Sequence, residues 1–227
     1  MPAGNSNQLS FDLAFRPAME REDFLVSECN AAAVGAVDRF ETLSPPILVI
    51  VGPAGAGKTH LSEVWRKSSN AVRADASSFD EEAAARMLAA GAGIIEDMPG
   101  DTGMRDEGAL FHALNAAVQQ RIRLLLTSRT PPPAWGLATQ DVSTRLRLAS
   151  VVTIGLPDDA LFAALIMKLM ADRQMTVAAN ALRYAVPRLE RSFEAAERFV
   201  AAVERKSVER RRTVTLGIVR EVIAGED

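Results

Sequence analysis

Short runs of β-branched and leucine side chains, bounded by turn residues, recur along the first two thirds of the chain. They are "PPILVIVG" (45–52), "AGIIEDM" (92–98), "RLLLTS" (123–128) and "SVVTIGL" (150–156), with a more polar run, "NAVRADA" (70–76), of similar length. Apolar runs this short, flanked by glycine and proline, are typical of strands buried on both faces of a sheet. The pattern therefore predicts five strands.

The segments between these runs carry apolar residues at the spacing of helices. Candidate helices cover residues 31–40, 58–67, 79–89 and 107–120. Strands that alternate with helices favour a parallel sheet covered by helices on both faces. We therefore expect an α/β domain, which we assign to residues 19–156.

Beyond Pro157 the strand pattern ends and only helical patterns follow. They cover residues 159–175, 178–189, 192–206 and 215–223. The methionine and phenylalanine stripes in these segments are more typical of a helical core than of cofactor contacts. We expect a small helical domain over residues 157–227, and we treat residues 1–18 as an extended leader.

Composition and charge exclude several classes of protein. Of the 227 residues, 48% are hydrophobic, which is enough for a hydrophobic core. The net charge of -3 provides no broad positive potential for non-specific binding of nucleic acid. The basic run "ERKSVERRRT" (204–213) is typical of a solvated helix end. Cys29 is the single cysteine, so an internal disulfide and a thiolate metal cluster are excluded.

The sequence also lacks the signals of membrane insertion and export. No apolar run approaches the roughly 20 residues of a membrane-spanning helix. The leader has neither the cationic segment nor the apolar segment of a signal peptide. We therefore expect a cytoplasmic protein without a membrane partner.

One loop carries a phosphate-binding motif. "GPAGAGKT" matches G-x-x-x-x-G-K-[ST], with a predicted strand before it and a predicted helix after it, as the motif requires. Its glycines let backbone N–H groups point at phosphate oxygens, while Lys58 can reach the terminal phosphates and Thr59 can hold Mg²⁺. The nucleotide-binding residues predicted here are Gly52, Pro53, Ala54, Gly55, Ala56, Gly57, Lys58, Thr59 and the adjoining His60.

Two carboxylates, Glu96 and Asp97, end the predicted strand "GIIEDM". A P-loop site needs an acid on a neighbouring strand to hold the metal and to orient water. We assign Glu96, together with Thr59, to the metal and Asp97 to catalysis. Asp is the usual first residue of such a pair, so Glu96 argues against vigorous hydrolysis. Neither His60 nor His112 has companions at a useful metal-ligand spacing.

Several segments together resemble a known family. "DFLVSECNAAAVGAVDRF", the P-loop, "IIEDM", "LLLTSRTPPPAW", "DVSTRLRLASVVTI" and the helical tail are similar to the AAA+ family, and within it to the ATPase core and lid of DnaA-like proteins. The resemblance covers nearly the whole chain. It implies a P-loop parallel sheet with a helical lid, and ADP or ATP with Mg²⁺ as cofactor. We expect no helix-turn-helix DNA-binding domain, because no segment follows the tail.

The resemblance also implies roles for single residues. Phe24, Leu25 and Val26 fall in the segment that walls the adenine, although each could instead seat the first helix. Arg145 matches the arginine finger, in a loop before a strand, that completes the site of a neighbouring protomer. Arg147 is the alternative for this role.

The chain departs from the family pattern at two sensor positions. Arg129, which follows Thr127 and Ser128, stands where DnaA-like chains commonly carry Asp. The second-sensor position, where an Arg normally lies over the phosphates, falls on Glu194, and Arg191 could substitute for it. Because an acid repels phosphates, we expect weak intrinsic ATPase activity.

The leader contains "QLSFDL", which resembles the peptides that bind the DNA polymerase III sliding clamp. The predicted clamp-binding residues are Gln8, Leu9, Phe11 and Leu13. The amide of Gln8 would bond at the rim of the clamp pocket, and the apolar residues would fill its subsites. The alternative is a leader that folds back as an edge strand on its own domain.

Three hypotheses for the function follow from these resemblances. The preferred one is an adaptor that binds the clamp through residues 8–13, stimulates ATP hydrolysis by DnaA through Arg145, and so restrains replication initiation. The alternatives are an autonomous P-loop ATPase or nucleotide kinase, and an adaptor similar to helicase loaders. Direct binding of nucleic acid is not expected, and self-association is left open.

Overall fold

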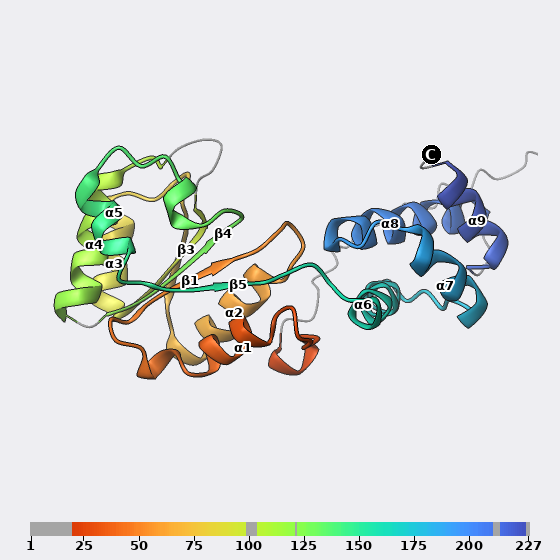
Figure 1. Cartoon of the computed structure of the whole chain (residues 1–227), viewed down its shortest axis with the longest axis horizontal. Coiled ribbons are helices and arrows are strands. Elements are labelled where there is room, and N and C mark those ends of the chain that lie inside the picture. The colour runs from red at the N-terminus through yellow and green to blue at the C-terminus, as the bar shows by residue number, and fades with distance from the viewer. Residues whose placement is uncertain (1–19, 99–103, 121, 211–213, 226–227) are drawn as a thin grey trace, which may run out of the picture.

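The computed structural model describes residues 20–98, 104–120, 122–210 and 214–225 and shows two domains, one α/β and one helical (Figure 1). The α/β domain has a five-stranded sheet in the order β2-β3-β4-β1-β5, and every neighbouring pair is parallel. The strands are β1 (Ile47–Val51), β2 (Val72–Asp75), β3 (Ala92–Met98), β4 (Arg123–Ser128) and β5 (Ser150–Thr153). All five coincide with the runs predicted from the sequence.

Helices cover both faces of this sheet (Figure 1). They are α1 (Ala31–Asp38), α2 (Lys58–Ser69), α3 (Glu81–Ala90), α4 (Glu107–Gln120) and α5 (Gln140–Leu146). Alternate residues of a strand point to opposite faces of the sheet, so β1 contributes side chains to the hydrophobic cores on both faces. Ile47 and Val49 pack with α3, α4 and α5, whereas Leu48 and Ile50 pack with α1 and α2. The helix α5 was not predicted, because its segment was interpreted as a loop.

The helical domain has a core of its own. It contains α6 (Asp159–Asp172), α7 (Ala179–Ala185), α8 (Phe193–Arg210) and α9 (Leu216–Ala224). A short 3-10 helix lies at Val186–Arg188 in this domain, and three others lie in the α/β domain at Arg21–Asp23, Phe40–Thr42 and Pro132–Ala134. Phe162, Phe199 and Val219 are almost completely buried between the helices of the helical domain. The side chain of Asp158 caps α6 by accepting a hydrogen bond from the N–H of Leu161 at 2.7 Å, which explains why a helix starts at "LPDD".

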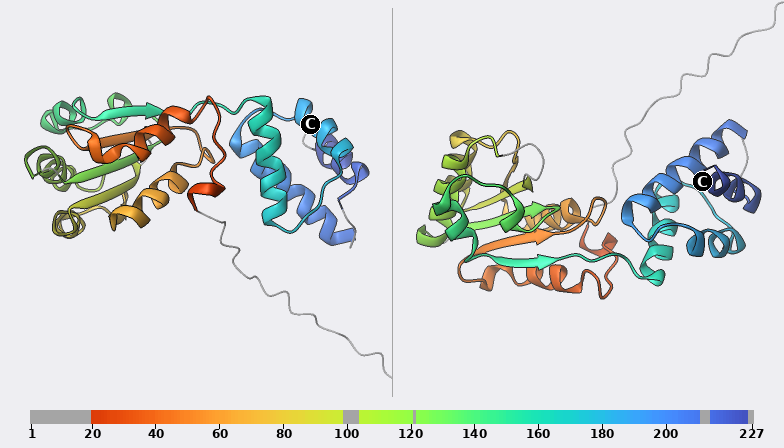
Figure 2. Two further views of the ribbon diagram at one scale, coloured as in Figure 1. Left: turned by 90° about the horizontal axis from the view of Figure 1, so that it is seen from below. Right: turned by 45° about the horizontal axis from the view of Figure 1, so that its top comes forward.

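The two domains meet on the side of the sheet that carries α1 and α2. Leu161 and Phe193, from the starts of α6 and α8, belong to the same buried cluster as Leu61 and Ile154 of the α/β domain. The connection after β5 is held by Gly155, whose N–H donates to the carbonyl of Cys29 at 2.8 Å. The helical domain is therefore seated beside the loop that follows β1 (Figure 2). None of the helices in the described ranges has the length and hydrophobicity of a membrane-spanning segment.

Candidate nucleotide-binding cleft

The P-loop joins the end of β1 to the start of α2, as its motif predicts. Gly55 and Gly57 have φ angles of 71° and 82°, a region that L side chains rarely adopt. A Cβ built on Gly57 would lie 2.7 Å from Cε2 of Phe24. Glycine is therefore required at position 57 both by its backbone conformation and by the ring packed against it.

Lys58 is held inside the loop, with 7% of its surface exposed. Its Nζ donates hydrogen bonds to the carbonyls of Gly52 and Pro53, both at 2.8 Å. Burial lowers the pKa of Lys58, the nearby carboxylate of Asp97 acts to raise it, and Arg129 acts to lower it further. An anion bound beside these groups would favour the charged form of Lys58, as expected of a phosphate-binding lysine.

The two carboxylates at the end of β3 have different surroundings. Glu96 is 3% exposed, accepts a hydrogen bond from the hydroxyl of Ser62 and forms an ion pair with Arg73. Asp97 is exposed and lines the P-loop, and its N–H donates to Oγ1 of Thr127 at 3.2 Å. Both oxygens of Glu96 thus have protein partners, so Asp97 is the carboxylate that a bound metal would meet first.

The exposure of Asp97 has a backbone cause. Its φ is 52°, and the β3–β4 pairing shifts register between Ile95 and Met98. This irregularity turns the Asp97 side chain out of the strand alternation and toward the loop. Carboxylate and hydroxyl oxygens are suitable ligands for Mg²⁺, so Asp97 and Thr59 could hold the ion together.

Two connected hollows open over the P-loop. The P-loop hollow has a volume of about 290 Å³, and a second, interdomain hollow has a volume of about 150 Å³. Their combined volume lies within the roughly 300–1,000 Å³ typical of small-molecule sites. They share Gly55, Ala56, Gly57, His60 and Glu197, and therefore form one cleft.

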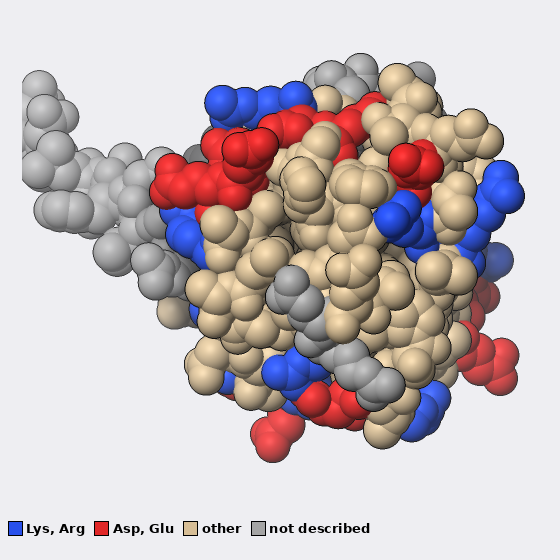
Figure 3. Space-filling model, turned by 90° about the vertical axis from the view of Figure 1, so that its left-hand side faces the viewer, with Lys and Arg blue, Asp and Glu red and all other residues tan. Residues whose placement is uncertain are grey.

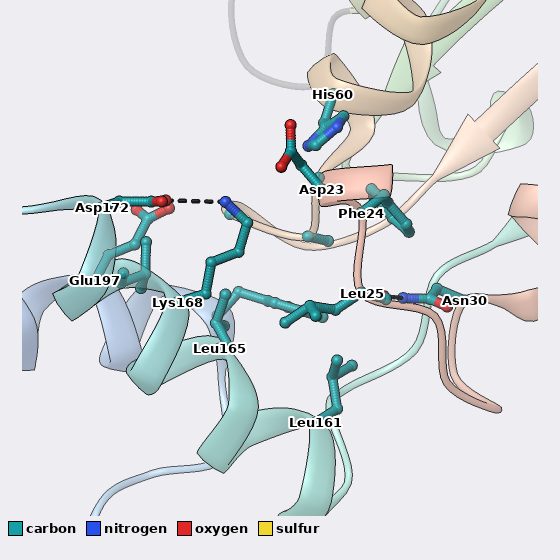
Figure 4. Close-up of a pocket in the computed structure, with 15 residues that line it drawn as sticks. Asp23, Phe24, Leu25, Asn30, His60, Leu161, Leu165, Lys168, Asp172 and Glu197 are labelled. Atoms are coloured by element: carbon teal, nitrogen blue, oxygen red, sulfur yellow. Dashed lines mark hydrogen bonds and ion pairs between the residues drawn. The ribbon is translucent and has the colours of Figure 1, made fainter. Parts of the chain in front are cut away.

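The interdomain hollow is mostly apolar (Figure 4). Phe24 and Leu25, two residues predicted to wall an adenine, line it, whereas Val26 is 51% exposed and does not. The ring of His60 stands edge-on to Phe24 at 5.2 Å between centroids, and its Nε2–H donates to the carbonyl of Glu20 at 2.8 Å. An apolar slot beside a phosphate-binding loop suits a flat heterocyclic base.

The other wall of this hollow comes from the helical domain and was missed from the sequence. It is formed by Leu161, Leu165, Lys168, Leu169 and Asp172 of α6 and by Phe193 and Glu197 of α8 (Figure 4). The α6 residues recur every three or four positions and so share one helix face. That spacing is visible in the sequence, but it does not distinguish a cleft wall from a core stripe.

On α8, the acid that lines the P-loop hollow is Glu197 and not Glu194, the residue predicted from the sequence. Glu194, the sequence candidate, is exposed and pairs with Arg198 at 3.2 Å. Glu197 instead lines both hollows, since it lies on the same face of α8 as Phe193. Arg191, proposed as a substitute for a second-sensor Arg, pairs with Asp159 at 2.5 Å and does not line the cleft.

Arg145 lies outside the cleft, on the last turn of α5 rather than in the predicted loop. Its guanidinium stacks over the ring of Phe111 at 4.3 Å, and its Nε donates to the side chain of Asn115. Arg147, just past the end of α5, is exposed and lines a separate hollow beside β5. The two arginines are therefore distinguished by their anchoring.

The leader residues Gln8, Leu9, Phe11 and Leu13 lie outside the described residues.

Solved structures with a similar fold include domain III of the replication initiator DnaA from Thermotoga maritima (15% identity, TM-score 0.75, covering 93% of this chain and 98% of that one). AMPPCP-bound DnaA from Aquifex aeolicus is 19% identical, with a TM-score of 0.68 over 86% of this chain and 68% of that one. The Holliday junction branch migration motor RuvB of Thermotoga maritima is 15% identical, with a TM-score of 0.68 over 91% and 72%.

These similarities confirm the predicted fold class, an AAA+ P-loop sheet with a helical lid. At such identities they establish the fold alone. No protein-family model matches the chain, and no curated protein matches its sequence.

Proposed function

We propose that this protein is an adaptor with an AAA+ fold that binds adenine nucleotide and stimulates ATP hydrolysis by DnaA, a role like that of Hda, the regulatory inactivator of DnaA. The supporting observation is the separation of two features. The P-loop cleft can hold a nucleotide, while Arg145 is anchored outside that cleft. An arginine that does not reach its own nucleotide is suited to complete the site of a partner.

The nucleotide is ADP or ATP, held by Gly52–Thr59, with its base in the interdomain hollow. Thr59 and Asp97 would hold Mg²⁺, which would neutralise part of the charge of the phosphates. The similar DnaA fold from Aquifex aeolicus binds AMPPCP, an adenine nucleotide analogue. The cleft has the glycines, the buried lysine and the apolar slot that such a ligand requires.

Arg145 would act on ATP bound to DnaA. A guanidinium inserted beside the γ-phosphate stabilises the charge that develops on the transferring group. Stacking on Phe111 and the bond to Asn115 hold this side chain in a defined direction, so it needs little reorganisation when the partner docks. The outcome would be DnaA in its ADP form, which restrains replication initiation in the cytoplasm.

The surface near this arginine suits a protein partner better than a nucleic acid. Figure 3 views the end of the molecule that carries α3, α4 and α5, and most of the middle of that face is neutral. Among the described residues of that face, basic side chains form no continuous area. This agrees with a net charge of -3, which gives no broad attraction for phosphate backbones.

The second partner would be the sliding clamp, bound through residues 8–13. We expect combined replacement of Gln8, Phe11 and Leu13 by Ala to abolish clamp binding, because the peptide would lose its rim hydrogen bond and two buried side chains. Surface plasmon resonance against immobilised clamp measures the loss. Ser10→Ala is the control, since Ser10 lies between the apolar residues Leu9 and Phe11 and is not itself assigned to a subsite of the clamp pocket.

The same triple variant decides between the two interpretations of the leader. If the leader is a clamp-binding peptide, the variant should lose clamp binding while its melting temperature and nucleotide affinity stay nearly unchanged. A large fall in melting temperature with clamp binding retained would instead show that the leader packs on its own domain.

Intrinsic ATPase activity should be low. Glu96 is committed to Ser62 and Arg73, and Glu197 places a negative charge beside the phosphates. We expect a turnover well below about 1 s⁻¹, the lower end of the ordinary enzyme range. Phosphate release by the purified chain measures it, and faster turnover would favour an autonomous ATPase.

One reconstitution tests the proposed function as a whole. ATP-loaded DnaA is incubated with this protein and with clamp loaded on DNA, and the conversion of bound ATP to ADP is followed. Stimulation that requires both proteins supports the proposal. Absence of stimulation, together with capture of the replicative helicase in place of DnaA, would favour the helicase-loader alternative.

A further inference from the structure

Glu197 brings a carboxylate from the helical domain onto the P-loop. A Cβ built on Gly55 would lie 3.3 Å from Oε1 of Glu197 and 3.0 Å from Cβ of Phe193. The Glu197 side chain lines both hollows, and the ion pair of Lys168 and Asp172 lines the interdomain hollow with it (Figure 4). Within the described part of the chain, no hydrogen bond or ion pair engages this carboxylate.

The charges around the P-loop are balanced rather than positive. Its hollow is lined by two cations, Lys58 and Arg129, and by two acids, Asp97 and Glu197. The lysine that the lid contributes to the cleft, Lys168, is neutralised by Asp172 at 2.9 Å. Sites that bind phosphate through charge usually contain several Lys or Arg side chains. The helical lid of this protein instead adds the carboxylate of Glu197, which repels phosphate groups.

We infer that Glu197 determines the specificity of the cleft by lowering its affinity for nucleotide, to an extent that grows with the charge of the phosphate chain. This inference rests on the proposed binding of nucleotide to the P-loop. Repulsion between the carboxylate and the phosphates falls when Mg²⁺ neutralises the phosphate charge, and it falls again when salt screens it. The lid therefore increases the extent to which nucleotide affinity depends on Mg²⁺.

The variant Glu197→Gln tests the inference, because it keeps the shape and removes the charge. Calorimetry with AMP, ADP and ATP, first in EDTA, measures the change in affinity. Glu197 is exposed, so solvent screening limits the expected gain to about 2- to 5-fold for ADP. The gain should be larger for ATP and smaller for AMP.

Two further measurements separate charge from shape. The gain should shrink in Mg²⁺, and it should shrink as salt rises from about 0.1 M to 1 M, where the Debye length falls from about 10 Å to 3 Å. Glu194→Gln is the matched control, since it removes the same charge from the same helix one turn outside the cleft. It should leave all three affinities unchanged.

The possible failures are distinguishable. Unchanged or weaker binding by Glu197→Gln, while the parent binds nucleotide, would overturn the inference. Weaker binding seen only with Mg²⁺ would also overturn it and would make Glu197 a metal ligand. Absence of binding by both the parent and the variant would refute the proposed nucleotide site itself.

Discussion

Replacing Arg145 by Ala is expected to remove the stimulation of DnaA. In phosphoryl-transfer systems that use an arginine supplied by a partner, this residue contributes about 10³–10⁵ in rate. We expect stimulated hydrolysis to fall toward the intrinsic rate of DnaA, because the charge on the transferring phosphate loses its guanidinium. Single-turnover hydrolysis of ATP bound to DnaA measures the loss directly.

The substitution should not unfold the protein. The variant loses the stacking of Arg145 on Phe111 and its bond to Asn115, and a half-buried cation–π contact contributes about 0.5–2 kcal/mol. The melting temperature, nucleotide affinity and clamp binding should therefore stay close to those of the parent. Arg147→Ala is the matched control. Normal stimulation by Arg145→Ala, with loss in Arg147→Ala, would assign the finger to Arg147 instead.

Replacing Lys58 by Ala is expected to weaken nucleotide binding by about 100-fold, which corresponds to the loss of strong charge-assisted hydrogen bonds to phosphate. Lys58 is the buried cation among the described residues that line the P-loop hollow, and without it Arg129 would remain there with the two acids Asp97 and Glu197. Calorimetry with Mg·ADP and Mg·ATP measures the change.

A control is needed because Lys58 also bonds the carbonyls of Gly52 and Pro53 in the protein itself. Its loss could distort the loop, so the melting temperature is measured without nucleotide. Lys67→Ala removes the same charge from the exposed far end of α2, where Lys67 pairs with Glu20. Unchanged nucleotide affinity in Lys58→Ala would show that the site lies elsewhere.

The two carboxylates at the end of β3 can be predicted from the sequence as a pair, but their separate surroundings cannot. The pair at positions 96 and 97 was predicted because it ends a buried strand and because a P-loop site needs an acid at such a strand end, and the structure places Asp97 in the lining of the P-loop hollow. Which acid faces the cleft could not be predicted, because it depends on a register shift between β3 and β4 and on the positive φ of Asp97.

In the helical lid, the helices can be predicted from the sequence, but the residue that reaches the P-loop cannot. The pattern predicts each of its helices, because a helix needs only contacts three and four residues apart. The residue that reaches the P-loop depends on how α8 packs against a segment more than 130 positions earlier. A difference of three residues, between Glu194 and Glu197, changes whether the acid pairs with Arg198 or lies over Gly55.

The amino-acid sequence alone predicts the order of the strands along the chain, the α-helices other than α5, and the position of the phosphate-binding loop. Each of these features depends on a short contiguous stretch of sequence: a strand on an apolar run, a helix on apolar residues at helical spacing, and the phosphate-binding loop on one eight-residue motif. Tertiary packing sets which side chains surround that loop and how Arg145 is anchored on Phe111 and Asn115. These contacts join distant segments, so they are set by the packing of whole elements and not by local spacing.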